Sequence, residues 1–242
     1  INLPISGQVV GTKASRSTHP RSLHLLQQLA NIVLERSIAV DNPFIWMTKA
    51  EVVADLAATK FRPLIARTIS CSRSREVNQI HPHCGVCAQC LQRRISTAGG
   101  GATDVDPAVD YAVDFLLGGR TDGPDRAMAV GTISRALELH RLADAEIVRQ
   151  FAGELGPVVQ GFPDIPAPET ARRFATLFKK HGSTVLHIVS DAIKEHSDQL
   201  ALGQVHSGSV LRLVMDGGNL PAFPSGMAPI SVPPPASNAD AS

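Results

Sequence analysis

Aromatic residues are scarce in this chain of 242 residues, since one Trp, one Tyr and eight Phe make up only 4% of it. So few rings cannot form the repeated stacking platform on which single-stranded nucleic acid is bound. The chain also lacks an apolar run of about 18 residues, so no transmembrane helix and no membrane partner are expected. No basic and then apolar leader follows Ile1, and this predicts a cytoplasmic location.

Cysteine is equally scarce, but its four residues all lie within one short stretch. The spacing C-x12-C-x2-C-x2-C joins Cys71, Cys84, Cys87 and Cys90. Four thiolates satisfy tetrahedral zinc, and two-residue spacings let one tight turn direct successive sulfurs at one ion. Gly85 permits the sharp backbone path that such a turn needs. The four cysteines are therefore predicted to be the ligands of a structural zinc ion, with no coordination position left open for catalysis.

Other uses of the cysteines stay open at this point. An iron–sulfur cluster also takes four thiolates, and C-x2-C-x2-C resembles part of a ferredoxin run. Two disulfides would suit a secreted chain, which no leader supports, and a redox-active pair needs a strand–C-x-x-C–helix context that is not obvious here. His81 and His83 flank the cluster, but four cysteines already complete a ligand set. Both histidines are therefore expected to be solvated loop residues.

The near-neutral formal charge of +1 hides an asymmetry between the two parts of the chain. Residues 1–100 hold 12 Lys and Arg against 5 Asp and Glu, a net charge of +7. Residues 101–242 hold 11 against 17, a net charge of −6. Such a contrast indicates two units with different partners. The basic part could face an anionic ligand such as a nucleotide, or it could be an ordinary solvated surface.

Local patterns predict the secondary structure. Apolar spacing predicts helices over 22–36, 49–58, 106–117, 125–155 with a possible break at Gly131, 169–180 and 183–202. Short apolar runs predict strands over 5–12, 44–47 and 210–215. Thr48-Lys49-Ala50-Glu51 has the capping-box pattern, so Glu51 is expected to cap a helix rather than to act as a general base.

Composition predicts three units. Residues 1–96 would form a unit with the zinc site, and the Gly-rich stretch 97–102 would be a linker. Residues 103–216 would form a mainly helical extension. Residues 217–242 hold Pro, Ser, Ala and Asn with little to bury, and a disordered tail is expected there.

Two segments together resemble the carboxy-terminal part of 7-cyano-7-deazaguanine synthase. NPFIWMTKAE at 42–51 is similar to the family's P-L-x-x-L-T-K-x-E segment, and CGVCAQCLQRR at 84–94 is similar to its C-G-x-C-x-x-C-x-x-R zinc segment. The matching positions are Pro43, Thr48, Lys49, Glu51, Cys71, Cys84, Gly85, Cys87, Cys90 and Arg93. The resemblance covers about residues 5–95, so an enlarged relative rather than the housekeeping enzyme is expected.

The resemblance implies an α/β fold, namely the carboxy-terminal part of a Rossmann-like (adenine nucleotide alpha-hydrolase-like) domain with a four-cysteine zinc knuckle. It implies a PP-loop ATP pyrophosphatase that activates a 7-deazaguanine carboxylate as an adenylate. Ammonia then displaces AMP to give an amide and finally a nitrile. The implied cofactors are zinc and ATP with magnesium. The implied partners are the 7-deazaguanine substrate, ATP, and a second copy of the chain or the proteins of a defence complex.

The family's nucleotide loop, S-G-G-x-D-S, is absent from residues 1–242. The glycines at 99–101 do not replace it, because they lack Asp-Ser and follow a helix rather than a strand. A chain that starts at Ile1 is therefore expected to be a fragment whose amino-terminal portion carries that loop. It would then belong to a carbon–nitrogen ligase of queuosine-type biosynthesis. The alternative is a non-catalytic or divergent synthase-like zinc protein of an anti-phage defence or DNA-modification system.

Three residues are expected to bind substrate by their place in the resemblance. His19 lies in a polar loop where the family's substrate pocket would be, although His19 and Thr18 replace the family's usual acidic and cysteine residues. Lys49 could contact an anionic group, or it could be a surface lysine beside the helix cap. Arg93 and its neighbour Arg94 could neutralise nucleotide charge, or lie on the surface. No catalytic residue is assigned.

Overall fold

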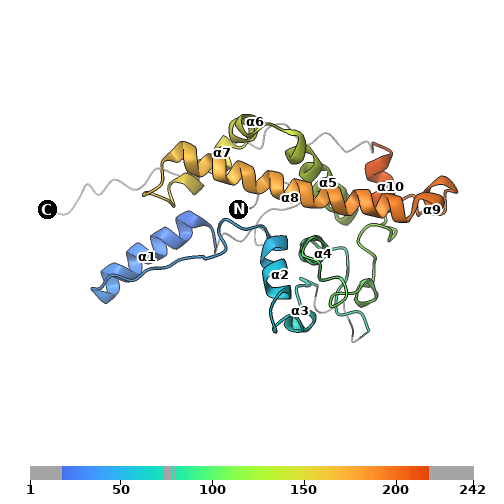
Figure 1. Cartoon of the computed structure of the whole chain (residues 1–242), viewed down its shortest axis with the longest axis horizontal. Coiled ribbons are helices and arrows are strands. Elements are labelled where there is room, and N and C mark those ends of the chain that lie inside the picture. Colours follow the sequence, from blue (N-terminus) through green and yellow to red (C-terminus); the bar gives the residue numbers. More distant parts are fainter. Residues whose placement is uncertain (1–17, 74–77, 79, 218–242) are drawn as a thin grey trace.

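The computed structural model describes residues 18–73, 78 and 80–217. Within these ranges the chain is a set of helices joined by turns (Figure 1), and one isolated parallel bridge between His83 and Tyr111 is the only β-type pairing. The helices are α1 (Pro20–Leu34), α2 (Lys49–Ala57), α3 (Leu64–Arg67), α4 (Ala88–Gly99), the 3-10 turn η2 (Ala108–Asp110), α5 (Pro124–Arg141), α6 (Asp144–Gln150), α7 (Ala152–Val159), α8 (Ala167–Glu195), α9 (Ser197–Ala201) and α10 (Val210–Met215). The α/β class is therefore not confirmed by the described residues. The strand expected over 5–12 and almost all of the tail expected over 217–242 lie outside them.

Two local predictions are confirmed near the start of the described chain. The amphipathic pattern at 22–36 corresponds to α1, and the pattern at 49–58 corresponds to α2. The capping box is formed, since Thr48 Oγ1 accepts from the Glu51 amide at 3.1 Å and Glu51 Oε2 accepts from the Thr48 amide at 2.7 Å. Glu51 is therefore a capping residue, and it also pairs with Lys180 of α8 at 2.7 Å.

The strand prediction for residues 44–47 is wrong, because these residues form tight turns. The side chain of Asn42 accepts a hydrogen bond from the Phe44 amide at 3.0 Å, and the Asn42 carbonyl accepts from the Ile45 amide at 3.1 Å. Asn favours such local turns because its short side chain can bond its own backbone two residues on. This polar residue therefore overrides the strand preference of the apolar residues after it.

The strand prediction for residues 210–215 is also wrong, since these residues are helix α10. Ser209 caps the helix by accepting the Arg212 amide at 3.2 Å. Val210 and Leu211 are fully buried in the main core. A short apolar run does not distinguish a buried strand from a buried helical turn, and here the Ser cap and the packing decide for the helix.

Helix α8 runs without interruption through the expected boundary at 181–182 and crosses the molecule as its longest helix (Figure 1). Gly182 lies where α8 packs on α5. A Cβ atom at this position would stand 2.5 Å from the Ala136 carbonyl oxygen and 2.8 Å from the His140 amide nitrogen. Gly182 therefore permits close contact of two helices rather than ending one. Gly131 is likewise buried inside α5, and the predicted helix over 125–155 is divided instead into α5, α6 and α7.

The predicted linker over 97–102 is wrong, because helix α4 continues through Gly99. Thr97 is buried, and its hydroxyl donates to Asp106 at 2.7 Å. The prediction of a helix over 106–117 is also wrong, because only the turn η2 forms there. The Asp106 side chain is instead buried, where it accepts hydrogen bonds from α4. Composition alone therefore missed a tightly packed junction.

Side chains from α4, α5, α8 and α10 build the main core, in which Leu91 and Ile95 of α4 are almost completely buried. A second core joins α6, α7 and α8 and includes Trp46, whose ring lies 5.0 Å from those of Phe162 and Phe174. The predicted division between residues 1–96 and 103–216 stays a prediction, and the main core spans it. None of the helices in the described ranges has the length and apolar character of a membrane span.

Candidate metal centre

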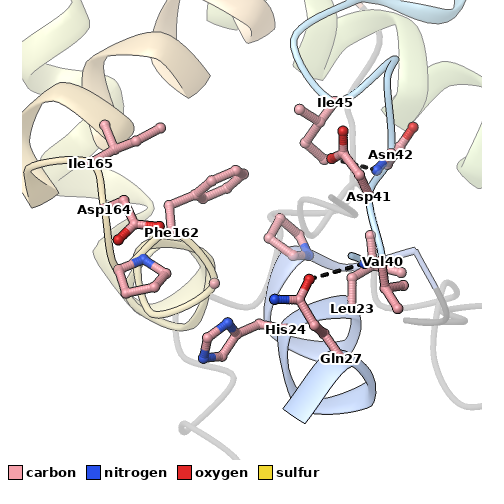
Figure 2. Close-up of a pocket in the computed structure, with 13 residues that line it drawn as sticks. Leu23, His24, Gln27, Val40, Asp41, Asn42, Ile45, Phe162, Asp164 and Ile165 are labelled. Atoms are coloured by element: carbon pink, nitrogen blue, oxygen red, sulfur yellow. Dashed lines mark hydrogen bonds between the residues drawn. The ribbon is translucent and has the colours of Figure 1, made fainter. Parts of the chain in front are cut away.

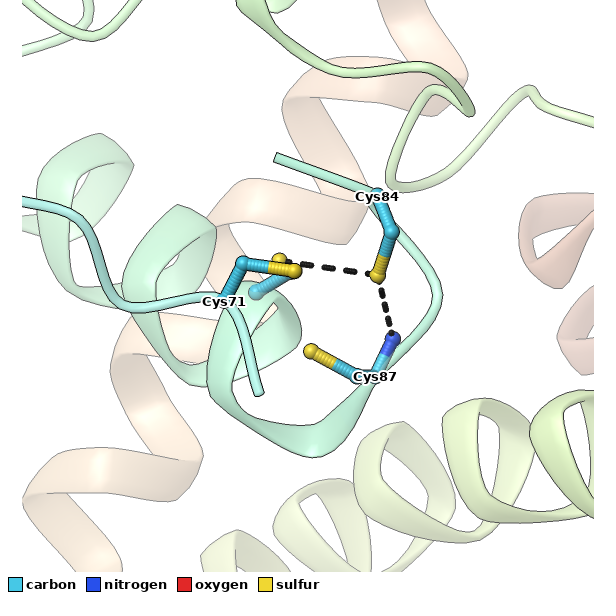
Figure 3. A group of neighbouring side chains, drawn as sticks. Cys71, Cys84 and Cys87 are labelled. Carbon is cyan, nitrogen blue, oxygen red and sulfur yellow. Dashed lines mark hydrogen bonds between the residues drawn. The ribbon is translucent and has the colours of Figure 1, made fainter. Parts of the chain in front are cut away.

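The four cysteines come from two segments that meet beside the first turn of α4 (Figure 3). Cys87 is the N-cap residue directly before α4, and Cys90 lies in the first turn of the helix. Cys84 precedes them across a turn, and Cys71 follows α3. The turn needs Gly85, whose φ is +76°, a left-handed conformation that side chains with a Cβ disfavour. The predicted turn that brings the four cysteines together is therefore present as a local structure, in an arrangement that could hold a metal ion.

The sulfur geometry fits one tetrahedral metal ion such as zinc. All four Sγ atoms lie within 4.8 Å of one another, and those of Cys84 and Cys90 are 3.8 Å apart. Tetrahedral zinc with Zn–S bonds of about 2.3 Å places its sulfurs about 3.8 Å apart. All four residues are buried and none is in a disulfide. Backbone amides point at two sulfurs, from Cys87 to Cys84 Sγ and from Arg73 to Cys71 Sγ, each at 3.4 Å.

The pKa values of three of the four thiols shift in different directions. Hydrogen bonds from the Cys84 and Cys90 thiols hold the pKa of Cys87 well below its ordinary value, while the same contacts raise the pKa of Cys84 and of Cys90. Metals bind the thiolate form, so occupation of the site releases protons. Acid is therefore expected to favour release of the metal.

His83 is a correction to the sequence analysis, since it is buried rather than solvated. Its ring stacks on Tyr111 with centroids 4.8 Å apart. Burial and the Arg93 charge lower the pKa of His83, which favours the neutral imidazole. His81 is half-buried, and its Nδ1 lies 3.0 Å from the Val109 carbonyl oxygen. The described site thus has four sulfur ligands and two histidines packed beside them.

We expect the purified protein to contain about one zinc ion per chain, because four thiolates complete one tetrahedral set. Mass-spectrometric elemental analysis of protein freed of loosely bound metal measures this ratio. A chain that carries iron with visible absorption, or no metal at all, would contradict the assignment.

Arg93, one of the predicted substrate contacts, forms hydrogen bonds with neighbouring protein groups. Its guanidinium is buried and donates to Asp106 at 2.7 Å, to the Thr68 hydroxyl at 2.6 Å and carbonyl at 2.9 Å, and to the Ile65 carbonyl at 2.8 Å. Arg93 therefore ties the end of α3 and the segment after α4 to the helix that carries the metal ligands. This packing role accounts for its position without a ligand.

Asp106 is the residue that sequence reasoning missed in this region. It is 1% exposed and accepts hydrogen bonds from Arg93, Arg94, Thr97 and Tyr111. Burial by itself raises the pKa of Asp106, but the hydrogen bonds from Thr97 and Arg93 outweigh it and hold the pKa below its ordinary value. The one sequence signal was the adjacent Arg pair at 93–94, which needs an acidic partner if it is buried.

Lys49, the second predicted substrate contact, lines a cavity of about 530 Å³ between the turns at 42–47, α2, α4 and α8. Lys49 is exposed to solvent, and its ammonium group makes no hydrogen bond or ion pair with any described residue. Partial desolvation by the surrounding protein lowers its pKa. Gln89 and Gln92 of α4 add polar groups to the cavity, and Phe44 and Met47 add apolar surface. The cavity lies in the size range of small-molecule sites.

His19, the third predicted contact, lies elsewhere. It caps α1, where its Nδ1 accepts from the Arg21 amide at 3.2 Å, and it is not among the residues that line the Lys49 cavity. A second cavity of about 390 Å³ lies between α1, residues 40–45 and the loop 161–165 (Figure 2). There Gln27 accepts from the Val40 amide at 3.0 Å. The structure therefore brings Lys49 and Arg93 to one cavity and leaves His19 outside it.

Comparison with known proteins supports the similarity on which these residues were chosen. A family model described as queuosine biosynthesis protein QueC matches residues 17–98, which are 82 of the 242 residues. No curated protein and no solved structure matches the chain. The match contains all four cysteines, Lys49 and Arg93, and it ends just before the close of α4. Residues 17–98 are thus a partial match to the 7-cyano-7-deazaguanine synthase (QueC) family, and the match includes the segment with the four cysteines.

Proposed function

We propose that the matched segment is the zinc-bearing part of an ATP-dependent carbon–nitrogen ligase that converts a 7-deazaguanine carboxylate to a nitrile with ammonia. The observation that carries the proposal is the cavity of about 530 Å³ between α2, α4 and α8, with a Lys49 ammonium that has no partner among the described residues. This cavity is lined by residues of the family-matched segment and by Phe174 and Leu177 of α8.

The lining chemistry suits such a substrate. An ammonium group without an acidic partner among the described residues can pair with a ligand carboxylate, and charge-assisted hydrogen bonds of this kind are among the stronger ones. The side-chain amides of Gln89 and Gln92 both donate and accept, as the edge of a guanine-like ring requires. Phe44 and Met47 offer apolar surface to the ring face. Lys49 would therefore orient the carboxylate, and α4 would read the base.

Zinc at Cys71, Cys84, Cys87 and Cys90 would stabilise α4 and would leave no open position for substrate. ATP, which would activate the carboxylate as an adenylate with release of pyrophosphate, would be bound by a nucleotide loop of the S-G-G-x-D-S type, which residues 1–242 do not contain. In this proposal the chain holds the base and its carboxylate, and the adenylating loop comes from a longer form of the protein or from a separate polypeptide.

Changing Lys49 to Ala is expected to weaken binding of 7-carboxy-7-deazaguanine about tenfold or more, because a hydrogen bond between charged groups contributes about 1.5–3 kcal/mol. Isothermal titration measures the dissociation constant. Lys60→Ala is the matched control, since Lys60 is an exposed lysine just beyond α2 that does not line the cavity. Equal affinities for both variants and the unchanged protein would contradict the role of Lys49, and no binding by the unchanged protein would contradict the proposed substrate.

The alternative is a synthase-like zinc protein of a defence or DNA-modification system without catalysis of its own. It is favoured by the helical region after residue 98, which the family match does not include. The binding experiment separates the two, because only the ligase requires the deazaguanine carboxylate as a ligand. AMP release in the presence of a loop-bearing polypeptide would support the ligase directly.

A further inference from the structure

The metal-ligand segments are packed against a stretch of chain that lies beyond the family-matched residues. We define residues 106–125 as the clamp segment. Its backbone pairs with the residue before Cys84: the His83 amide donates to the Asp110 carbonyl at 3.2 Å, and the Ala112 amide donates to the His83 carbonyl at 2.9 Å. The path into the metal turn is therefore set by the clamp segment, which the match to residues 17–98 does not contain.

The turn itself is held at Gly85. A Cβ atom there would stand 1.9 Å from the Val113 carbonyl oxygen, so the clamp segment lies directly against the turn. Arg120 is 5% exposed and donates from its guanidinium to the Gly85 carbonyl at 3.0 Å and to the Gly118 carbonyl at 3.2 Å. Its own amide donates to the Gly208 carbonyl at 3.1 Å. Arg120 thus links the metal turn to the chain that leads into α10.

The segment that carries Cys71 is tied to the same stretch. The Arg73 amide points at Cys71 Sγ, and the Arg73 side chain pairs with both carboxylate oxygens of Asp125 at 2.7 and 2.9 Å. Asp125 lies in the first turn of α5, at the end of the clamp segment. Both ligand segments, which come from opposite sides of the site, are therefore fastened to one third element.

Charge points the same way as geometry. Four thiolates around a divalent ion leave a net charge of −2, which is costly to bury without a compensating charge. Arg120 lies within electrostatic reach of Cys84, whereas the guanidinium of Arg73 is already paired with Asp125. The Arg120 guanidinium therefore stands where it offsets part of this negative charge.

We infer that the clamp segment is a working part of the metal centre, with Arg120 and Asp125 as positioning residues that hold the two ligand segments and slow release of the metal. The inference rests on metal binding at the four cysteines. It does not depend on the substrate or the reaction proposed above.

The test is the rate at which zinc passes from the full chain to a chromogenic chelator at neutral pH. Arg120→Ala is expected to release zinc at least tenfold faster than the unchanged protein. Arg120→Lys should fall between the two, because it keeps the charge but loses the fork that bridges two carbonyls. Asp125→Asn should release zinc severalfold faster. Arg126→Ala is the matched control beside it, since that side chain pairs with the exposed Asp122 and not with a ligand segment.

The possible results distinguish the metal assignment from the role of the clamp segment. An unchanged protein without zinc would overturn the metal assignment itself. Zinc-loaded variants that release the metal as slowly as the unchanged protein would contradict the role of the clamp segment in holding the metal. Loss of helical circular dichroism in Arg120→Ala would move the decision to Asp125→Asn, whose ion pair is about one-third exposed and can be broken without opening the core. An unaltered release rate for that variant would then overturn the inference.

Discussion

We expect the Cys87→Ser variant to lose its metal and to unfold around α4. Structural zinc contributes folding free energy directly, with apparent values of about 10–16 kcal/mol in zinc-finger peptides at neutral pH. Cys87 is both a candidate ligand and the N-cap residue of α4. Leu91 and Ile95 of the same helix lie in the main core with α5 and α8. Loss of the metal should therefore lower the melting temperature of the helical region as well as that of the cysteine segment.

Thermal melts followed by circular dichroism, together with elemental analysis, measure both effects. Ile80→Ser is the matched control, because Ile80 lies between the ligand segments, is 73% exposed and is not a ligand. The control should keep its zinc and its melting temperature. A Cys87→Ser protein that melts as the control does would show that the metal has no structural role.

The second large effect is expected for Asp106→Ala, which should lower the free energy of unfolding by about 3–5 kcal/mol. Removing one partner of a buried ion pair leaves the other charge uncompensated. Here the side chains of Arg93 and Asp106 are 6% and 1% exposed. Chemical denaturation at neutral pH measures the change.

Asp104→Ala provides the comparison, two residues away in the same loop. Asp104 pairs with Arg62, but its side chain is 65% exposed, and exposed pairs contribute about 0–1 kcal/mol. Equal losses of unfolding free energy for the two variants would contradict the importance of burial.

The carboxyl group of Asp106 also makes the stability of the protein depend on pH. Because the pKa of Asp106 is lowered from its ordinary 3.8, its contribution is complete above that value and is lost as the pH falls through the lowered pKa. The Asp106→Ala protein should lack that part of the acid destabilisation.

Features that depend on neighbours in the chain could be predicted. The capping box needs only Thr48 and Glu51, three residues apart, and it starts α2 as expected. The cysteine spacing needs only one turn and one glycine to converge, and the sulfurs do lie together. These predictions hold because the residue types and their spacing carry the chemistry whatever surrounds them.

Features that depend on packing could not be predicted. Residues 210–215 have the composition of a strand, but burial against α5 and α8 selects a helix. The glycine at 182 is typical of a helix end, but close contact with α5 makes it the middle of α8. Arg93 and Lys49 both matched the family pattern, and only their surroundings distinguish a buried structural arginine from a lysine that pairs with none of the described residues.

The metal centre shows the same division. Its four candidate ligands can be read from residues 71–90, because ligand type and spacing are local properties. The groups that hold those ligands come from far along the chain: Arg120 reaches Gly85 across 35 residues, and Asp125 reaches Arg73 across 52. Such pairs are created when α4, α5 and α8 close around a shared core, so only the folded chain identifies them.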